Sequence, residues 1–442
     1  MTNNEILVSG AGIAGPALAY WLRAGGFKVT VVERAPGPRP GGQTVDLRGA
    51  GRTVIERMGL MDRARAVSVD QRGLALVDAS GRITARVPAD SFGGEGIVSE
   101  IEILRGDLAR LLYDSTLTGG SPLPYGSPLP YDSTRPYDST PPDTEYLFDD
   151  TVTGISQGTD ADADAVTVTF EKAAPRRFGL VVGADGPHSV VRALAFGPER
   201  EFVHPLGLYT AWFTAVDDDL ELDGWYMMHN APGGLVASAR PGRLPGEVKV
   251  GLSFRSPPLA LDRRDVAAQQ DLLARHFANA GWETPRLLRA MRTAPDFFFD
   301  SMGQVRLDRW SRGRVALLGD AGYCASPLTG LGTSLALAGA YVLAGEITAA
   351  RGDHRIAFRR YDEIMRPYVS QAQQLPPGGA SGFAPSGRLG IRLRDLSMRQ
   401  MTRWPMRSVL AAQFAKAGDI ALPEYGPAER VGPAGGGRWG TG

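Results

Sequence analysis

The first 34 residues have the pattern of apolar and polar positions expected for a strand, a turn, a helix and a second strand, in that order. The apolar run at residues 6–8 predicts one buried strand, and the run at 28–32 predicts another. Between them, residues 16–23 predict a helix, which Gly25-Gly26 ends. The pattern indicates the opening unit of an α/β fold, with a glycine-rich turn between its first strand and its helix.

Further along the chain, two sheet-rich blocks interrupt the alternation of strands and helices. Residues 73–100 predict a hairpin with Ser80-Gly81 in its turn, and residues 200–302 predict an antiparallel sheet. We therefore expect an α/β protein in which a Rossmann-like domain is interleaved with a sheet-rich substrate domain. The first domain is expected to comprise residues 1–72, 101–199 and 303–370, the second residues 73–100 and 200–302, and a C-terminal helical region with a frayed tail residues 371–442.

Residues 117–146 have low complexity. Ser-Pro-Leu-Pro-Tyr begins at residue 121 and again at 127, and Tyr-Asp-Ser-Thr occurs three times between residues 113 and 140. This stretch has too much proline for a helix or sheet and too few apolar residues for a core. It is predicted to be an expanded surface loop, with a substrate lid or a polyproline segment for a partner as alternatives.

Composition excludes several classes of protein. The 442 residues carry 48 basic and 48 acidic side chains, so no overall charge favours nucleic acid or an anionic membrane. The single cysteine, Cys324, excludes an internal disulfide and a cysteine-based metal site, and no metal is expected. Because no apolar leader and no run of about 18 apolar residues occurs, we expect a cytoplasmic protein without a membrane partner.

The turn after the first strand has the spacing of a dinucleotide site. Gly10 allows the tight turn, Gly12 lets backbone N–H groups approach a pyrophosphate, and Gly15 lets the helix pack closely on the strand. Glu33 ends the second strand, near the spacing at which an acidic residue accepts a ribose hydroxyl. A carboxylate there disfavours a 2′-phosphate, so FAD or NAD fits better than NADP.

Two later motifs complete a family resemblance. Gly183-Ala184-Asp185-Gly186 follows a buried strand and leads to Arg192, and Gly319-Asp320-Ala321-Gly322 precedes Pro327 and Gly330-Leu331-Gly332. In this order, the three motifs resemble the single-component flavoprotein monooxygenases, the FAD-dependent aromatic hydroxylases with the para-hydroxybenzoate hydroxylase fold. Residues 330–337 resemble the actinobacterial branch that includes tetracycline-modifying enzymes.

The resemblance implies an FAD site built from distant parts of the chain. Asp320 can accept hydrogen bonds from ribityl hydroxyls, and backbone N–H groups near Gly330 and Gly332 can face the N1/O2 edge of the flavin. Arg105 matches an arginine that reaches the cofactor phosphates, although an arginine on a helix surface is the alternative. The expected FAD-binding residues are Gly10, Gly12, Ile13, Ala14, Gly15, Glu33, Arg34, Arg48, Arg105, Asp185, Gly319, Asp320, Pro327, Gly330, Leu331 and Gly332.

The family chemistry implies a small-molecule substrate. NAD(P)H would reduce FAD transiently, oxygen would add at C4a, and the flavin hydroperoxide would hydroxylate an aromatic or polycyclic natural product. No catalytic side chain is assigned, and a monomer or weak homodimer is expected. One alternative keeps the fold and a structural FAD but catalyses a Diels–Alder-like cyclisation of a polyene. Another is a protein that only stores flavin or binds partners.

The substrate is expected between the flavin and the sheet of residues 200–302. Aromatic and thioether side chains suit such a wall, although at alternating strand positions they are often simply core. Residues 297–299 are three consecutive phenylalanines, which cannot all face one side of a strand. The candidate substrate residues are Trp212, Tyr226, Met228 and Phe298.

Overall fold

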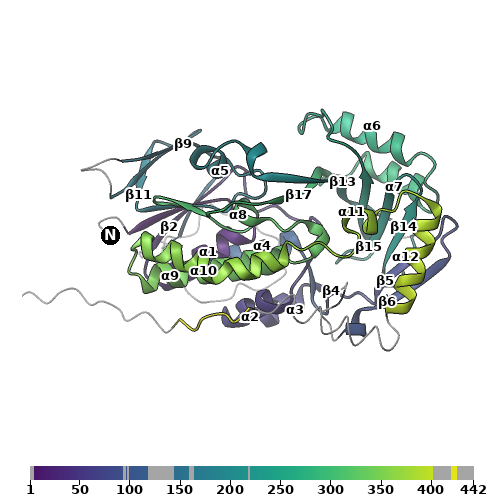
Figure 1. Cartoon of the computed structure of the whole chain (residues 1–442), viewed down its shortest axis with the longest axis horizontal. Helices are drawn as coiled ribbons and strands as arrows, with labels where there is room; N and C mark the ends of the chain where they lie inside the picture. Colours follow the sequence, from purple (N-terminus) through teal and green to yellow (C-terminus); the bar gives the residue numbers. More distant parts are fainter. Residues whose placement is uncertain are drawn as a thin grey trace, which may run out of the picture.

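The computed structural model describes residues 4–92, 96, 99–117, 144–158, 164–217, 220–401 and 420–425. It has two main sheets, with the parallel one to the left in Figure 1 and a larger one to the right. Within the described ranges, no helix is both long and apolar enough to cross a membrane. The α/β fold class with interleaved regions is confirmed.

The first sheet is parallel except for its short edge strand. Its order is β18 (Ser311–Arg312), β19 (Val315–Leu317), β12 (Leu180–Gly183), β1 (Glu5–Ser9), β2 (Lys28–Glu33) and β8 (Thr144–Phe148). The central strands are almost wholly apolar because both faces are covered. Ile6 and Val8 pack toward helices, whereas Leu7 packs toward the opposite layer.

Helices and a small sheet cover the two faces. On one face lie α1 (Ala14–Ala24), α9 (Gly332–Ala349) and α10 (His354–Ala372). On the other lie β9 (Val152–Gln157), β10 (Val166–Phe170), β11 (Arg176–Phe178) and α5 (Val190–Ala195). α9 is buried nearly all round, which accounts for its run of apolar and small residues.

The structure corrects the boundaries of the low-complexity loop. Residues 144–146, expected in that loop, begin β8, which pairs in parallel with β2, and Leu117 is the last residue of α4. Tyr146 and Phe148 stack at 5.5 Å between ring centroids, and this packing favours a strand over a loop. The repeats at 118–143 lie outside the described residues, as do 402–419 and the glycine-rich tail.

The larger sheet takes its strands from two separate stretches of the chain. Its seven strands run in the order β17 (Phe298–Val305), β13 (Val203–Val216), β16 (Glu247–Arg255), β15 (Leu235–Pro241), β14 (Trp225–Ala231), β5 (Gly73–Val77) and β6 (Ile83–Pro88). All neighbours are antiparallel except β14 and β5. The predicted hairpin is therefore present as β5 and β6.

Each face of the seven-stranded sheet has its own covering helices. α6 (Val266–Phe277) and α7 (Thr284–Met291) bury Phe277 and Met291 against one face. On the opposite face, α11 (Gly379–Phe383) and α12 (Arg388–Met401) pack beside Met228 and Val236, at the right of Figure 1. This second face also contacts Leu328, close to the last predicted motif.

Short elements join the two sheets. A three-stranded sheet consists of β3 (Thr44–Asp46), β7 (Glu102–Leu104) and β4 (Ser68–Val69). The remaining elements are α2 (Gly49–Arg57), α3 (Met61–Ala66), η1 (Ala89–Phe92), α4 (Arg105–Leu117), η3 (Glu199–Glu201), α8 (Asp320–Tyr323) and η4 (Pro327–Thr329). β7 leads directly into α4, and β3 lies just before α2, so both are anchored close to the parallel sheet.

Candidate functional site

The predicted FAD-binding motifs meet at one edge of the parallel sheet. β1, β2, β12 and β19 run in the same direction, and each is followed by one of the motifs. The glycine turn follows β1, Glu33 ends β2, and Asp185 and Asp320 follow β12 and β19. The carboxyl edge of a parallel sheet is where α/β folds bind ligands.

The glycine turn is packed too tightly for side chains at two positions. Gly10 has a φ of 107°, and a Cβ there would lie 2.5 Å from the carbonyl oxygen of Ala184. A Cβ on Gly15 would lie 1.9 Å from the Gly10 carbonyl oxygen. Ile13, the residue before α1, provides no side-chain cap, so the N–H groups of the first turn, which includes Ala14, can face an anion.

Gly12 and Arg105 face each other across the predicted phosphate position. A Cβ on Gly12 would lie 3.5 Å from Nη2 of Arg105 and, apart from atoms of Gly12 and its two chain neighbours, within 4 Å of no other described atom. Within the part of the chain that the structure describes, the Arg105 guanidinium forms no hydrogen bond. Burial lowers the pKa of Arg105, and the nearby carboxylate of Asp320 opposes this shift. A cation without a partner beside bare backbone N–H groups suits a pyrophosphate.

Glu33 is fixed at the end of β2 by backbone donors. The N–H groups of Ala11 and Ala35 each donate to its carboxylate at 2.9 Å, and Arg39 forms an ion pair at 3.1 Å. Each carboxylate oxygen can accept a second hydrogen bond, so a ribose hydroxyl could still be bound. Arg34, which follows, is exposed at the same edge.

The segment after β19 brings Asp320 and a second glycine loop to the site. Gly319 has a φ of 62°, which turns the chain so that Asp320 begins α8. Burial raises the pKa of Asp320, while its hydrogen bond with Cys324 and the charge of Arg105 oppose the rise. The carboxylate therefore lies in a low-dielectric position close to Arg105.

The loop from Pro327 to Gly332 lies against β3 and the residue before α2. Gly330 has a φ of 65°, and a Cβ there would lie 3.1 Å from Oδ2 of Asp46 and 3.4 Å from Nη2 of Arg48. Arg48 forms an ion pair with Asp46, and its carbonyl accepts from Oγ of Ser334 at 2.8 Å. Leu331 is buried, and no side chain caps the amino end of α9 at Gly332.

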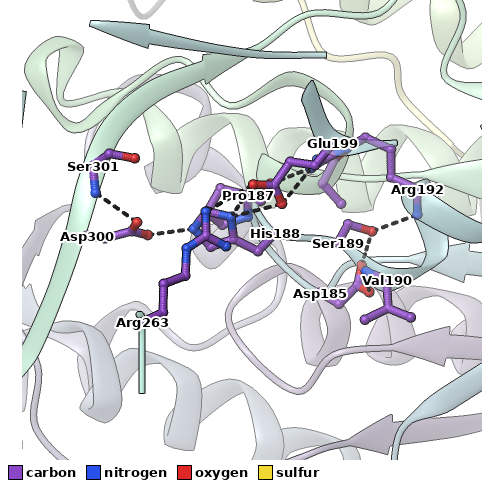
Figure 2. A network of polar contacts seen from close by, with 11 residues as sticks. Asp185, Pro187, His188, Ser189, Val190, Arg192, Glu199, Arg263, Asp300 and Ser301 are labelled. Carbon is purple, nitrogen blue, oxygen red and sulfur yellow. Dashed lines mark hydrogen bonds and ion pairs between the residues drawn. The ribbon is translucent and has the colours of Figure 1, made fainter. Parts of the chain in front are cut away.

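Asp185 has partners within its own motif. Its carboxylate accepts hydrogen bonds from the Ser189 hydroxyl and, at 2.8 and 3.2 Å, from the N–H groups of Val190 and Val191 (Figure 2). These groups belong to the amino end of α5, whose first turn Asp185 stabilises. Direct contact of Asp185 with the cofactor stays a prediction.

Arg192 joins the second motif to the third. Its side chain is fully buried and donates to the carbonyls of Pro187 at 2.6 Å and Ala321 at 2.9 Å. Glu199 is 3.8 Å away. Arg192 therefore has a structural role, and it holds the chain beside Asp320 in place.

His188, in the same motif, connects to the seven-stranded sheet. Its Nδ1 lies 3.1 Å from Glu199 and its Nε2 lies 2.7 Å from Oδ2 of Asp300 in β17 (Figure 2). Arg263 pairs with Glu199 at 3.0 Å. Burial alone would lower the pKa of His188, but hydrogen bonds with Asp300 and Glu199 outweigh it and raise the pKa to about 9. His188 is therefore a cation that links the two sheet regions near neutral pH.

The four predicted substrate residues lie on one face of the seven-stranded sheet. Trp212 pairs in register with Phe298, and their rings stack at 6.1 Å between centroids. Tyr226 and Met228 belong to the same apolar cluster as Trp212, and Leu328 of η4 packs there too. Phe297 and Phe299 pack into the core on the opposite face, as expected for consecutive strand residues. Binding of substrate by these residues stays a prediction.

A buried ion pair beside Tyr226 was missed in the sequence. Arg240 of β15 pairs with Glu102 of β7 at 2.6 Å, and its guanidinium carbon lies 3.8 Å from the centre of the Tyr226 ring. Burial raises the pKa of Glu102 to about 7, although Arg240 opposes this shift. The one sequence signal for this ion pair is the arginine that ends the apolar run of β15.

Comparison with known proteins gives the family. Residues 139–374 match the family described as FAD binding domain. A flavin-dependent monooxygenase of Legionella longbeachae is 34% identical over 424 residues, covering 96% of this chain and 98% of that protein. The chain belongs to the flavin-dependent monooxygenase family.

A second protein sequence and a solved structure are also similar to this chain over most of its length. The Mycobacterium tuberculosis protein Rv1260 is 45% identical over 381 residues, covering 86% of this chain and 94% of that protein. The crystal structure of tetracycline destructase Tet(51) matches with a TM-score of 0.74 and 32% identity, covering 96% of this chain and all of that one. The family resemblance noted in the sequence, the enzyme class and the FAD cofactor are thereby confirmed, and NAD(P)H is the reductant typical of the family.

The residues of the monooxygenase fit FAD. The bare backbone at Gly12, the Arg105 guanidinium and the uncapped start of α1 lie together at the predicted phosphate position, and Glu33 lies at the predicted position of the adenosine ribose. Asp320 and the Gly330 loop lie farther along the same edge, where the other half of the cofactor would be bound. The individual contacts with FAD stay predictions.

Replacing Arg105 with methionine should weaken FAD binding by about 10- to 100-fold, because one charge-assisted contact to phosphate is lost. The dissociation constant can be measured by fluorescence titration of apoprotein with FAD. Arg110→Met on the same helix is the control, since Arg110 pairs with Asp114 away from the cradle. Equal FAD affinity in the wild type and Arg105→Met would contradict the assignment.

The charged form of His188 should stabilise the fold below about pH 9. Its folded-state pKa, about 9, is above its ordinary value of 6.5, so the stabilisation is fully present below pH 6.5 and lost as pH rises through 9. At full strength it is worth about 3 kcal/mol, at about 1.4 kcal/mol per pKa unit. The unfolding free energy of His188→Gln should therefore fall below that of wild type at pH 6.5 and approach it by pH 10.

Urea unfolding across this pH range measures the difference. His204→Gln is the control, because His204 is exposed. A gap between His188→Gln and wild type that does not change with pH would show that His188 is not titrating in this way.

Proposed function

We propose that the monooxygenase uses NAD(P)H and O₂ to hydroxylate an aromatic or polycyclic small molecule. One observation carries the proposal: the aromatic and thioether side chains of Trp212, Tyr226, Met228 and Phe298 share the sheet face that adjoins the Gly330 loop. Planar ring systems stack on such side chains. The similarity to Tet(51), titled a tetracycline destructase, favours a polycyclic substrate.

Bound FAD would supply the redox chemistry, accepting a hydride from NAD(P)H and activating oxygen at its C4a position. The protein would provide binding, orientation and exclusion of water. Backbone N–H groups at the start of α9 and near Gly330 are placed to stabilise negative charge on the reduced ring. This chemistry needs no side-chain nucleophile.

The overall reaction balances as one substrate C–H, O₂, NAD(P)H and a proton giving a C–OH, water and NAD(P)⁺. The two electrons of the nicotinamide and two from the C–H bond together reduce the two oxygen atoms. One oxygen atom enters the product and the other leaves as water. The reductant is therefore consumed in equal amount to product when turnover is coupled.

Anaerobic mixing with NADPH or NADH should bleach the flavin absorbance, and admission of ¹⁸O₂ with a tetracycline or a naphthol should give a product carrying one labelled oxygen. Mass spectrometry measures incorporation. If neither nicotinamide reduces the flavin with or without these compounds, the redox proposal is wrong, and the cyclase with a structural FAD becomes the better reading.

Substitutions at Phe298 and Phe297, which lie on opposite faces of the sheet, distinguish an effect on substrate binding from an effect on folding. Phe298→Leu should raise the substrate KM roughly fivefold, since loss of stacking is worth about 1 kcal/mol. It should leave the fold intact, because Phe298 is 48% exposed. Steady-state NAD(P)H oxidation measures KM. Phe297→Leu, on the opposite face, is the control, and it should lower the stability of the fold while KM stays unchanged. If both substitutions changed KM equally, the placement of Phe298 in the substrate site would be refuted.

A further inference from the structure

Arg394 of α12 extends onto the sheet face that holds the predicted substrate residues. Its Nη2 lies 3.1 Å from the sulfur of Met228, and its Nη1 donates to the amide oxygen of Asn230. Asn230 is held in turn by its own donation to the carbonyl of Phe383 at 3.0 Å. Tyr226 is near enough to interact electrostatically with the guanidinium.

The partners of Arg394 carry no charge. In the described part of the chain, its hydrogen-bond acceptors are one amide oxygen and one thioether, and no carboxylate lies within ion-pair distance. A thioether is a weak acceptor, and a guanidinium has five donors to satisfy. Burial lowers the pKa of Arg394, with only Asp395 and Tyr226 opposing the shift. The charge is therefore desolvated without being neutralised.

Two other cations on this face are neutralised. Arg240 pairs with Glu102 at 2.6 Å, and Lys249 pairs with Glu247 at 2.6 Å. Arg240 and Lys249 face each other in register across β15 and β16. Each of these charges therefore has a carboxylate partner, which Arg394 lacks among the residues that the structure describes. A half-buried, unpaired guanidinium beside an aromatic wall is suited to an anionic group of a ligand.

The helix that carries Arg394 is fixed on the sheet by its neighbours. Asp395 accepts a hydrogen bond from the Thr84 hydroxyl at 2.8 Å, and Arg399 donates to the Thr84 carbonyl. Met398 packs into the same apolar cluster as Met228. The guanidinium is thus held in place before a ligand binds, which reduces the entropy lost on binding.

We propose that Arg394 binds an acidic oxygen of the substrate, so that the enzyme acts on aromatic or polycyclic compounds that carry a carboxylate, phenolate or enolate. This inference rests on the proposed function, because that function places the substrate on this face. Arg394 acts in binding and orientation and takes no part in oxygen transfer. Neutral ring systems of the same shape would bind more weakly.

Two probes of nearly equal shape test the proposal without turnover. The oxidised FAD holoenzyme is titrated with 2-naphthoate and with 2-naphthamide, and binding is followed by the change in flavin absorbance. Wild type should bind the carboxylate at least tenfold more tightly than the amide. Arg394→Gln should bind the two alike, and Arg394→Lys should retain part of the preference.

Arg392→Gln is the matched control, because Arg392 is exposed on the same helix and the charge change is the same. It should keep the wild-type preference. Equal binding of the two probes by wild type, no binding of either, or an unchanged preference in Arg394→Gln would overturn the proposal. The enzyme could also prefer 2-naphthoate in a way that depends on Arg394 and yet fail to hydroxylate any substrate. That result would support the anion site and reject the proposed reaction.

Discussion

The cofactor site depends on the contact between the Gly10 turn and the backbone at Ala184. At this point the loops after β1 and β12 approach so closely that a Cβ on Gly10 would lie 2.5 Å from a carbonyl oxygen. Gly10 N–H donates to the carbonyl of Val32 at 2.7 Å, so the end of β2 is fixed as well. One residue without a side chain thus sets the spacing of three strand ends, and the placement of Glu33 and of the Asp185 motif follows from it.

Five cations near the two proposed sites fall into two groups. Arg192, Arg240 and Lys249 have acceptors within the protein, so they contribute to structure. Arg105 lacks a hydrogen-bond partner and Arg394 lacks a carboxylate among the described residues. Arg105 is exposed and Arg394 is half-buried, so each guanidinium is accessible to an anionic group of a ligand. Arg105 lies at the predicted cofactor edge, and Arg394 lies on the sheet face of the predicted substrate residues.

Much of the fold could be predicted from sequence because its signals are local. The strand, glycine turn and helix at residues 6–23, and the later Gly-Asp and Asp-Gly motifs, are contiguous patterns with fixed spacing. β8 was missed because its five residues follow a long proline-rich stretch, and its partner β2 is more than a hundred residues earlier. The pairing of Glu102 with Arg240 could not be read from sequence either, since it depends on how β7 meets β15.

The two main sheets are connected by charged side chains as well as by the polypeptide backbone. His188 belongs to the motif at the cofactor edge, yet it contacts Asp300 on β17, whose neighbour in the strand order is β13, the strand of Trp212. Arg192, four residues later, contacts Ala321 beside Asp320. The loop between these residues is therefore fixed on both sides, to β17 through His188 and to the segment beside Asp320 through Arg192. Since oxygen transfer requires the substrate and the flavin at a defined distance, this double attachment is a physical means of keeping that distance constant.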